Sequence, residues 1–176
     1  TLDMDALDAI RRKRDTRTFL DQDIDDEPLD VVLDAARMGG SAKNRQPVRI
    51  VAVRDAATKL ALTKAGDFAT WIPDAPVVCV FAVREELLPR GLFDVGRHAQ
   101  NLMVAAKALG LGSCPVTLHH EAGARDALGV PDDMSVQFLV APGWPQPGEK
   151  APEGIAGPRL ALDTYAFRER WSADET

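Results

Sequence analysis

Residues 94–113, with the sequence DVGRHAQNLMVAAKALGLGS, decide the fold. Apolar side chains recur at steps of three and four from Val95 to Leu109, which is the spacing of one helical face. Further alanines widen that face, so we expect the helix to be buried on most sides. Asp94 is a suitable N-cap and Gly110 a suitable C-terminal stop. The stretch therefore predicts a long central helix around which the rest of the chain is arranged.

The segments on either side alternate between helical and extended patterns. Helix signals mark residues 3–14, 28–38, 56–64 and 121–128, whereas apolar runs mark strands at 49–53, 75–83, 113–118 and 135–141. The run over 75–83 is apolar throughout, which is typical of a strand at the centre of a sheet. This order of elements predicts an α+β fold of three layers, with helices around a central sheet.

Composition narrows the class of protein. The 176 residues carry a formal net charge of −6 and are 45% hydrophobic, so we expect one globular domain over residues 1–176. The acidic balance argues against a nucleic-acid partner or an anionic membrane surface. No stretch reaches the ~20 apolar residues of a membrane span, and no secretion signal is recognisable. Cys79 and Cys114 form no disulfide framework and lack metal-ligand spacing, which favours a cytoplasmic protein without a metal site.

One strongly basic stretch stands out in this acidic chain, with Arg or Lys at positions 11, 12, 13, 14 and 17. By itself it is either a solvated helix end or a phosphate clamp, since guanidinium groups bind phosphate oxygens in pairs. Residues 13–19, KRDTRTF, resemble the opening motif of the nitroreductase family, R-R-S-x-R-x-F, which holds the phosphate of FMN. The resemblance implies that Lys13, Arg14 and Arg17 bind that phosphate.

Asp15 departs from the family pattern, which usually has Ser at this position. An aspartate beside a phosphate is repulsive unless an arginine lies between them. Asp15 therefore either holds Arg14 or Arg17 in position or accepts a hydrogen bond from a flavin hydroxyl group. Its role stays open at this stage.

Residues 41–48, SAKNRQPV, are similar to the family segment S-x-x-N-x-Q-P-W. In the family this loop crosses the dimer boundary, which implies that Ser41 and Asn44 hydrogen-bond the flavin of the partner subunit. By itself the segment is a polar turn in which Ser and Asn cap the backbone. Val48 replaces the common Trp, a change that we expect to alter local packing more than cofactor contacts.

The central helix resembles the family segment D-x-G-x-A-x-Q-N-L, which is the hub of the dimer, and we expect its His98 to be structural. The residues that follow imply flavin contacts by Pro115, Thr117 and Leu118, with the N–H of Thr117 or Leu118 donating to flavin N5. Residues 157–160 resemble a late R-x-P-L element, which adds Arg159 as a phosphate ligand. His119 and His120 come next to the flavin segment and are expected at the pocket mouth without binding a metal.

Taken together, residues 10–162 resemble the nitroreductase family. The resemblance implies a mixed, mainly antiparallel sheet flanked by helices, in a homodimer, with the apolar tail from about 160 to 176 packed on the partner. It also implies an enzyme in which FMN takes a hydride from NAD(P)H and passes it to a small acceptor by a ping-pong mechanism. The acceptor classes are nitroaromatics, quinones and flavins. We name no catalytic side chain because the flavin performs the redox step.

Two other functions stay open on the same scaffold: an oxygen-dependent enzyme that fragments flavin, and a flavin-binding protein without enzymatic activity. The physiological acceptor and the choice between NADH and NADPH are not readable from the sequence. The chain is also short between residues 61 and 74, where many family members insert helices over the flavin. We expect Phe68, Trp71 and Ile72 to form a small lid instead.

Overall fold

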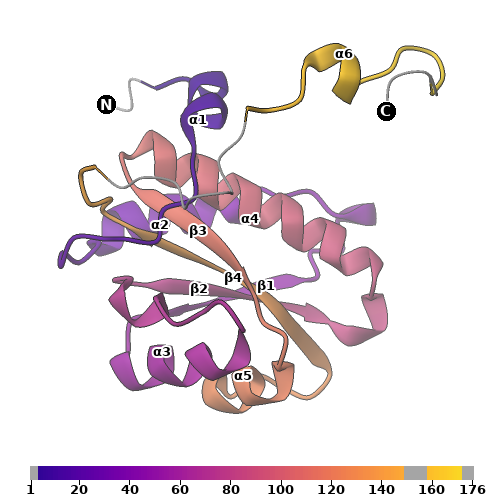
Figure 1. The fold of residues 1–176 in the computed structure, drawn as a ribbon. Coiled ribbons are helices and arrows are strands. Elements are labelled where there is room, and N and C mark those ends of the chain that lie inside the picture. The colour runs from indigo at the N-terminus through magenta and orange to yellow at the C-terminus, as the bar shows by residue number, and fades with distance from the viewer. Residues whose placement is uncertain (1–3, 149–157, 172–176) are drawn as a thin grey trace.

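A four-stranded sheet forms the centre of the computed structural model, which describes residues 4–148 and 158–171 (Figure 1). The strands are β1 (Val48–Val53), β2 (Val78–Arg84), β3 (Gly112–Thr117) and β4 (Met134–Gly143), in the spatial order β1-β2-β4-β3. Neighbouring strands in this sheet pair antiparallel. An isolated parallel bridge joins Asp15 to Ser113 on the outer edge of β3. The predicted mixed, mainly antiparallel sheet is confirmed.

Helices cover both faces of the sheet. The described helices are α1 (Ala6–Arg12), α2 (Asp26–Arg37), α3 (Ala56–Leu62), α4 (Arg90–Ala108), α5 (Glu121–Leu128) and α6 (Leu162–Tyr165), of which α2 to α5 form the two covering layers. Short 3₁₀ turns add η1 (Ala42–Asn44), η2 (Thr63–Ala65), η3 (Ile72–Asp74) and η4 (Glu85–Leu87). Helices α2 and α4 lie on one face, α3 and α5 lie on the other, and α1 packs against α4 (Figure 1). The predicted three layers are confirmed.

Strand β2 explains why two layers of helices are needed. Successive side chains of a strand point to opposite faces. Val78, Val80 and Ala82 join the core under α3 and α5, whereas Cys79, Phe81 and Val83 join the core under α2 and α4. All six are at most 3% exposed. The run without a polar residue therefore predicts a central strand correctly, because both of its faces are covered.

The predicted start of the central helix is wrong. Helix α4 begins at Arg90, with Pro89 as its N-cap residue, so Asp94 lies inside the helix instead of capping it. His98 on this helix is 6% exposed, and its Nδ1 lies 2.7 Å from the carbonyl oxygen of Asp94. That placement agrees with a structural role for His98.

The C-terminal segment that contains α6 stands away from the three layers (Figure 1). Four large apolar side chains of this segment are 68–77% exposed, namely Leu160, Leu162, Tyr165 and Trp171. Packing of this tail on a partner subunit stays a prediction. Among the described residues, no helix is both long and apolar enough to cross a membrane.

Candidate functional site

The basic motif, residues 13–19, lies against the free edge of β3. Since β3 is the last strand of the sheet, its outer edge has no strand beside it. Thr16 donates its backbone N–H to the carbonyl oxygen of Ser113 at 3.1 Å. This contact fixes the chain next to β3 and carries Arg17 toward the second half of the strand.

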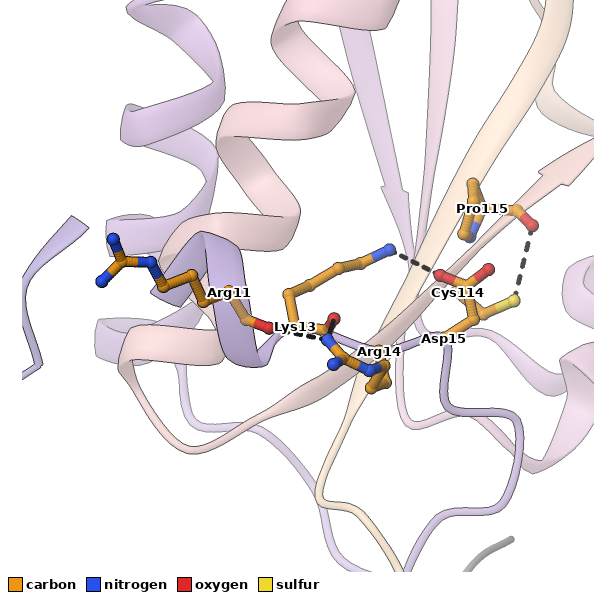
Figure 2. Close-up of polar contacts among 6 residues, drawn as sticks. All are labelled: Arg11, Lys13, Arg14, Asp15, Cys114 and Pro115. Atoms are coloured by element: carbon orange, nitrogen blue, oxygen red, sulfur yellow. Dashed lines mark hydrogen bonds and ion pairs between the residues drawn. The ribbon is translucent and has the colours of Figure 1, made fainter. Parts of the chain in front are cut away.

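Polar contacts within the motif give Asp15 a partner (Figure 2). The Nζ of Lys13 lies 2.5 Å from Oδ1 of Asp15, and the Lys13 side chain is only 16% exposed. The guanidinium of Arg14 instead donates to the carbonyl oxygens of Arg11 and Lys13, at 2.7 Å each. The carboxylate of Asp15 thus offsets the charge of Lys13 inside the cluster, a role that the sequence did not single out.

The sequence left open whether Thr117 or Leu118 donates its N–H to flavin N5. The hydrogen-bond ladder between β3 and β4 distinguishes these two candidates. Antiparallel neighbours alternate between pairs that exchange hydrogen bonds and pairs that do not. Leu118 donates its N–H to Gln137 at 2.8 Å, so Leu118 belongs to the first kind. Thr117, paired with Phe138, belongs to the second kind and directs its N–H away from β4. Pro115 occupies an equivalent position, where its lack of an N–H costs nothing in the ladder.

A pocket of about 710 Å³, here called the edge pocket, opens along this free edge. Its lining comes from the basic motif, from β3 and from the 66–71 segment: Arg17, Asp67, Phe68, Thr70, Trp71, Pro115, Val116, Thr117 and His119. Of the residues predicted to bind the cofactor, Arg17, Pro115 and Thr117 thus meet in one place. Leu118 is 2% exposed and packs in the core beneath.

Two of the three residues predicted to form a lid line the edge pocket, and the lid itself stays a prediction. Phe68 and Trp71 line the edge pocket, and Phe68 is 81% exposed. Ile72 is fully buried in the core under α3 and α5, so its inclusion in the lid is wrong. The indole N–H of Trp71 donates to the carbonyl oxygen of Phe68 at 3.0 Å, which holds the segment in a compact turn.

Ser41 and Asn44 lie elsewhere, in the loop that contains η1. Ser41 lines a second pocket of about 930 Å³, between this loop and the beginning of α4. Its Oγ accepts the backbone N–H of Gln46 at 2.8 Å, and Lys43, Asn44 and Gln46 have positive φ angles. Ser41 therefore shapes a tight polar turn, and a flavin contact from this loop stays a prediction that needs a second subunit. Arg159 is exposed, and its neighbour Gly157 lies outside the described residues.

The two cysteines take no part in the edge pocket. Both are fully buried, and burial raises the pKa of the Cys79 thiol to about 12. A thiol with a raised pKa stays protonated near neutral pH and is a poor nucleophile. The chemistry of the pocket therefore depends on Arg17, Asp67, His119 and backbone groups.

Asp67 is a titratable lining residue that the sequence did not indicate. It lies between two imidazoles, with Oδ2 3.5 Å from Nδ1 of His119 and Oδ1 3.4 Å from Nε2 of His120. The histidines were expected at the pocket mouth, and His119 lines the pocket. No local pattern marks Asp67, because about fifty residues separate it from the histidines and only the packing of its loop on β3 brings them together.

Comparison with known proteins gives a consistent picture. The family model described as "Nitroreductase family" matches residues 10–70 and 67–144. A protein named NADH dehydrogenase from Thermus thermophilus is 30% identical, over 91% of this chain and 94% of its own. An FMN reductase that uses NAD(P)H, from Bacillus subtilis, is 24% identical over 95% of this chain and 74% of its own. The crystal structure of nitroreductase A from Vibrio parahaemolyticus superposes with a TM-score of 0.84 at 26% identity, covering 96% of this chain and 78% of that one.

Proposed function

The chain belongs to the nitroreductase family, and from this membership we propose that it is a single-domain, FMN-dependent NAD(P)H oxidoreductase that works as a homodimer in the cytoplasm. The observation that carries the proposal is the edge pocket. Arg17 and Thr117 both line it, and the strand register directs the N–H of Thr117 away from β4. The Bacillus subtilis relative supports the cofactor and the donor, since its name includes both FMN and NAD(P)H.

The residues present suit FMN. Arg17 supplies a cation for the phosphate, and Lys13 and Arg14 lie within four positions of it. Trp71 and Pro115 offer apolar surface for a planar ring, and the N–H of Thr117 would donate to its N5. When bound, FMN supplies the redox chemistry, because a flavin accepts a hydride and passes it on. The part of this chain is to hold the ring and to donate a hydrogen bond to N5, which would favour the reduced flavin.

Lys13 has a second role in this proposal. Its ammonium group faces the Asp15 carboxylate, which limits the repulsion among the cations of the motif. A bound phosphate would attract Lys13 and Arg14, because both have long, flexible side chains that can rotate toward it. Arg159, beyond residues 149–157, is the fourth proposed phosphate ligand.

Two subunits would complete the site. Ser41 and Asn44 lie on the loop beside α4, and α4 carries Phe93 with 71% of its surface exposed. An exposed aromatic residue on a central helix is typical of a subunit interface. We propose that this face meets a second copy, so that Ser41 and Asn44 reach the partner's flavin. The exposed tail around Tyr165 would pack in the same assembly.

The proposed reaction is ping-pong: NAD(P)H reduces the flavin and leaves, then a small acceptor enters the same pocket. Nitroaromatics, quinones and flavins are the acceptor classes. The R-D-x-R form of the basic motif, from Arg14 to Arg17, resembles that of relatives that fragment flavin with oxygen, so this reaction is kept as a second candidate function. In that case flavin absorbance would be lost after reduction in air, whereas an oxidoreductase would recover it.

An absorption spectrum of the purified protein tests the proposal first. We expect flavin bands that survive desalting after FMN is added, bleaching by NADH or NADPH under anaerobic conditions, and recovery when an acceptor is supplied. Protein that retains no FMN would contradict the cofactor assignment. Protein that retains FMN but is bleached by neither nucleotide would instead be a flavin-binding protein without this activity.

A further inference from the structure

The edge pocket contains one group that can deliver a proton near neutral pH. Its titratable lining residues are Arg17, Asp67 and His119. Arginine stays protonated in proteins, and an exposed aspartate is ionised at pH 7. Histidine changes its charge between about pH 5 and 8, so it can both give and regain a proton there. His119 is therefore the candidate proton donor among the described lining residues.

The reaction proposed above needs such a donor. A hydride carries two electrons and one proton, so a quinone that accepts it becomes an anion until a second proton arrives. An anion without a nearby proton source is disfavoured in a pocket with much apolar surface. We propose, on the basis of the proposed function, that His119 donates this proton to the reduced acceptor and that Asp67 positions its imidazole.

The step balances without a further reactant. The N–H bond at Nε2 of His119 breaks, an O–H bond forms on the acceptor oxygen, and the quinone leaves as a hydroquinone. Water then returns a proton to the neutral imidazole, whose side chain is 42% exposed. Nε2 is the donor atom because Nδ1 is the ring nitrogen that faces Asp67, at 3.5 Å.

A close contact between two segments places Asp67 beside His119. A Cβ on Gly66 would lie 2.9 Å from the carbonyl oxygen of Thr117, so only glycine allows this approach to the end of β3. His120 also donates its backbone N–H to the carbonyl oxygen of Ala65 at 2.9 Å. These contacts fix the 65–67 backbone against the end of β3, which makes the juxtaposition of Asp67 and His119 a consequence of the fold.

Charged groups of both signs surround His119. Asp67 attracts the imidazolium, whereas Arg17 in the pocket lining and His120 next in the chain oppose it when charged. Glu121, at the start of α5, is engaged elsewhere: its carboxylate accepts from Ser135 Oγ at 2.7 Å and from the Val136 N–H at 3.1 Å. Asp67 is thus the carboxylate with an ion-pair contact to His119.

The test separates proton delivery from damage to the pocket. FMN-loaded protein is reduced anaerobically with NADH or NADPH, whichever bleaches it, and mixed in a stopped-flow instrument with menadione or with ferricyanide. Menadione takes a hydride and needs a proton, whereas ferricyanide takes single electrons and needs none. We expect His119→Gln to slow oxidation by menadione on the order of 100-fold while oxidation by ferricyanide is retained. The matched control is His120→Gln, because His120 contacts the same carboxylate but does not line the pocket.

Asp67→Asn provides a readout that does not depend on activity. In the protein without FMN, the ring ¹⁵N chemical shifts of the histidines are measured by NMR, because they report which ring nitrogen carries the proton. The neutral tautomer of His119 should carry its proton on Nδ1, which faces Asp67, and Asp67→Asn should remove this preference. The loaded variant should react more slowly with menadione while its reaction with ferricyanide is retained.

Three results would overturn the assignment. An unchanged menadione rate in His119→Gln would exclude proton donation by this residue, and equal slowing with both acceptors would show that His119 only shapes the pocket. A proton preference for Nδ1 of His119 that is unaffected by Asp67→Asn would remove the role of Asp67. Unaltered protein that binds no FMN, or is not bleached by NADH or NADPH, would instead contradict the proposed function itself, and the His119 proposal with it.

Discussion

The backbone N–H of Thr16 donates to the carbonyl oxygen of Ser113 at 3.1 Å, and this contact helps to join the basic motif to the edge of the sheet. Its geometry depends on the preceding residue of β3. A Cβ on Gly112 would lie 2.7 Å from the Cβ of Thr16, whose side chain is itself buried. The position of Arg17 in the edge pocket therefore depends on a glycine almost a hundred residues away in the chain.

Gly112→Ala should accordingly affect stability and cofactor binding together. The added methyl group displaces Thr16, and overpacking of this kind lowers the free energy of unfolding by about 1–3 kcal/mol. FMN affinity should fall because Arg17 moves with Thr16. Denaturant unfolding and quenching of FMN fluorescence measure the two effects.

Gly123→Ala is the matched control for Gly112→Ala. Gly123 lies within α5, and no heavy atom comes within 4 Å of a Cβ at that position. Alanine in a helix is favoured over glycine by about 0.5–1 kcal/mol, so this variant should be more stable and should bind FMN normally. Unchanged stability and FMN affinity in Gly112→Ala would contradict the packing argument.

The cap of α3 makes stability depend on pH. Hydrogen bonds from the side chain and then the backbone N–H of Thr58, both 2.7 Å to Oδ2 of Asp55, hold the pKa of that carboxyl below its usual value. A carboxyl with a lower pKa in the folded than in the unfolded chain stabilises the fold above its unfolded pKa of about 3.9. That contribution is lost as the pH falls through the folded value.

Asp55→Ala should therefore lower the Tm at pH 7, where the carboxylate caps the helix. At an acidic pH, below the unfolded pKa of about 3.9, the difference in Tm between the variant and the unaltered protein should shrink progressively as the carboxyl becomes protonated in both states. Thermal unfolding followed by circular dichroism at the two pH values checks this. A Tm difference that is equal at both pH values would show that the charge of Asp55 is not what stabilises α3.

Replacing Arg14 and Arg17 together by Ala should remove FMN and leave the assembly intact. The single variants should differ, since Arg17 lines the edge pocket whereas Arg14 donates to backbone carbonyls of its own turn. A hydrogen bond to a charged group contributes about 1.5–3 kcal/mol, so we expect Arg17→Ala to weaken FMN binding about 10- to 100-fold. Arg14→Ala should weaken it less.

The control for the arginine variants is Arg12→Ala. Arg12 pairs with Asp8 at 3.6 Å on the surface of α1, with 63% of its side chain exposed. Its loss should leave FMN binding unchanged. Gel filtration with detection at a flavin wavelength reports both cofactor and assembly state, and full flavin occupancy in the double variant would contradict the phosphate clamp.

Hydrophobic patterns predicted the arrangement of the elements because the core depends on them directly. The order of four strands among the first five helices follows from the sequence, and the apolar run of β2 identifies the central strand. The start of α4 did not follow, since Asp94 is a strong local capping signal. The added turn from Arg90 is stabilised by tertiary packing: at Gly91 a Cβ would lie 2.8 Å from Cγ2 of Val83. Such a contact is invisible in a local pattern.

Site residues that belong to a family motif could be predicted from the sequence. Those whose orientation depends on the strand register could not. Family motifs identify Arg17, Pro115 and Thr117, and the edge pocket gathers all three. Choosing Thr117 over Leu118 as the outward N–H required the pairing of β3 with β4, because a shift of one residue reverses every direction. Ile72 was misplaced for a similar reason, since the turn that contains it directs the side chain into the core.

Thr117→Pro tests the outward N–H directly. Proline should fit the strand, because Pro115 already occupies the equivalent register position and Val116 between them is extended, as a residue before proline requires. The variant loses the N–H that we assign to flavin N5, together with the Thr117 hydroxyl. A hydrogen bond contributes about 0.5–1.5 kcal/mol, and 30 mV corresponds to about 1.4 kcal/mol for two electrons, so the flavin potential should become about 10–30 mV more negative.

Thr117→Val separates the backbone from the side chain in that measurement. It removes the hydroxyl but keeps the N–H, so the potential of its flavin should match that of the unaltered protein. Spectroelectrochemical titration of both variants with bound FMN gives the comparison. If the two variants had the same potential, the N–H of Thr117 would not face N5, and the register argument from Leu118 and Gln137 would place the ring wrongly. A more negative potential in Thr117→Pro alone would show that the free edge of β3 stabilises the reduced flavin.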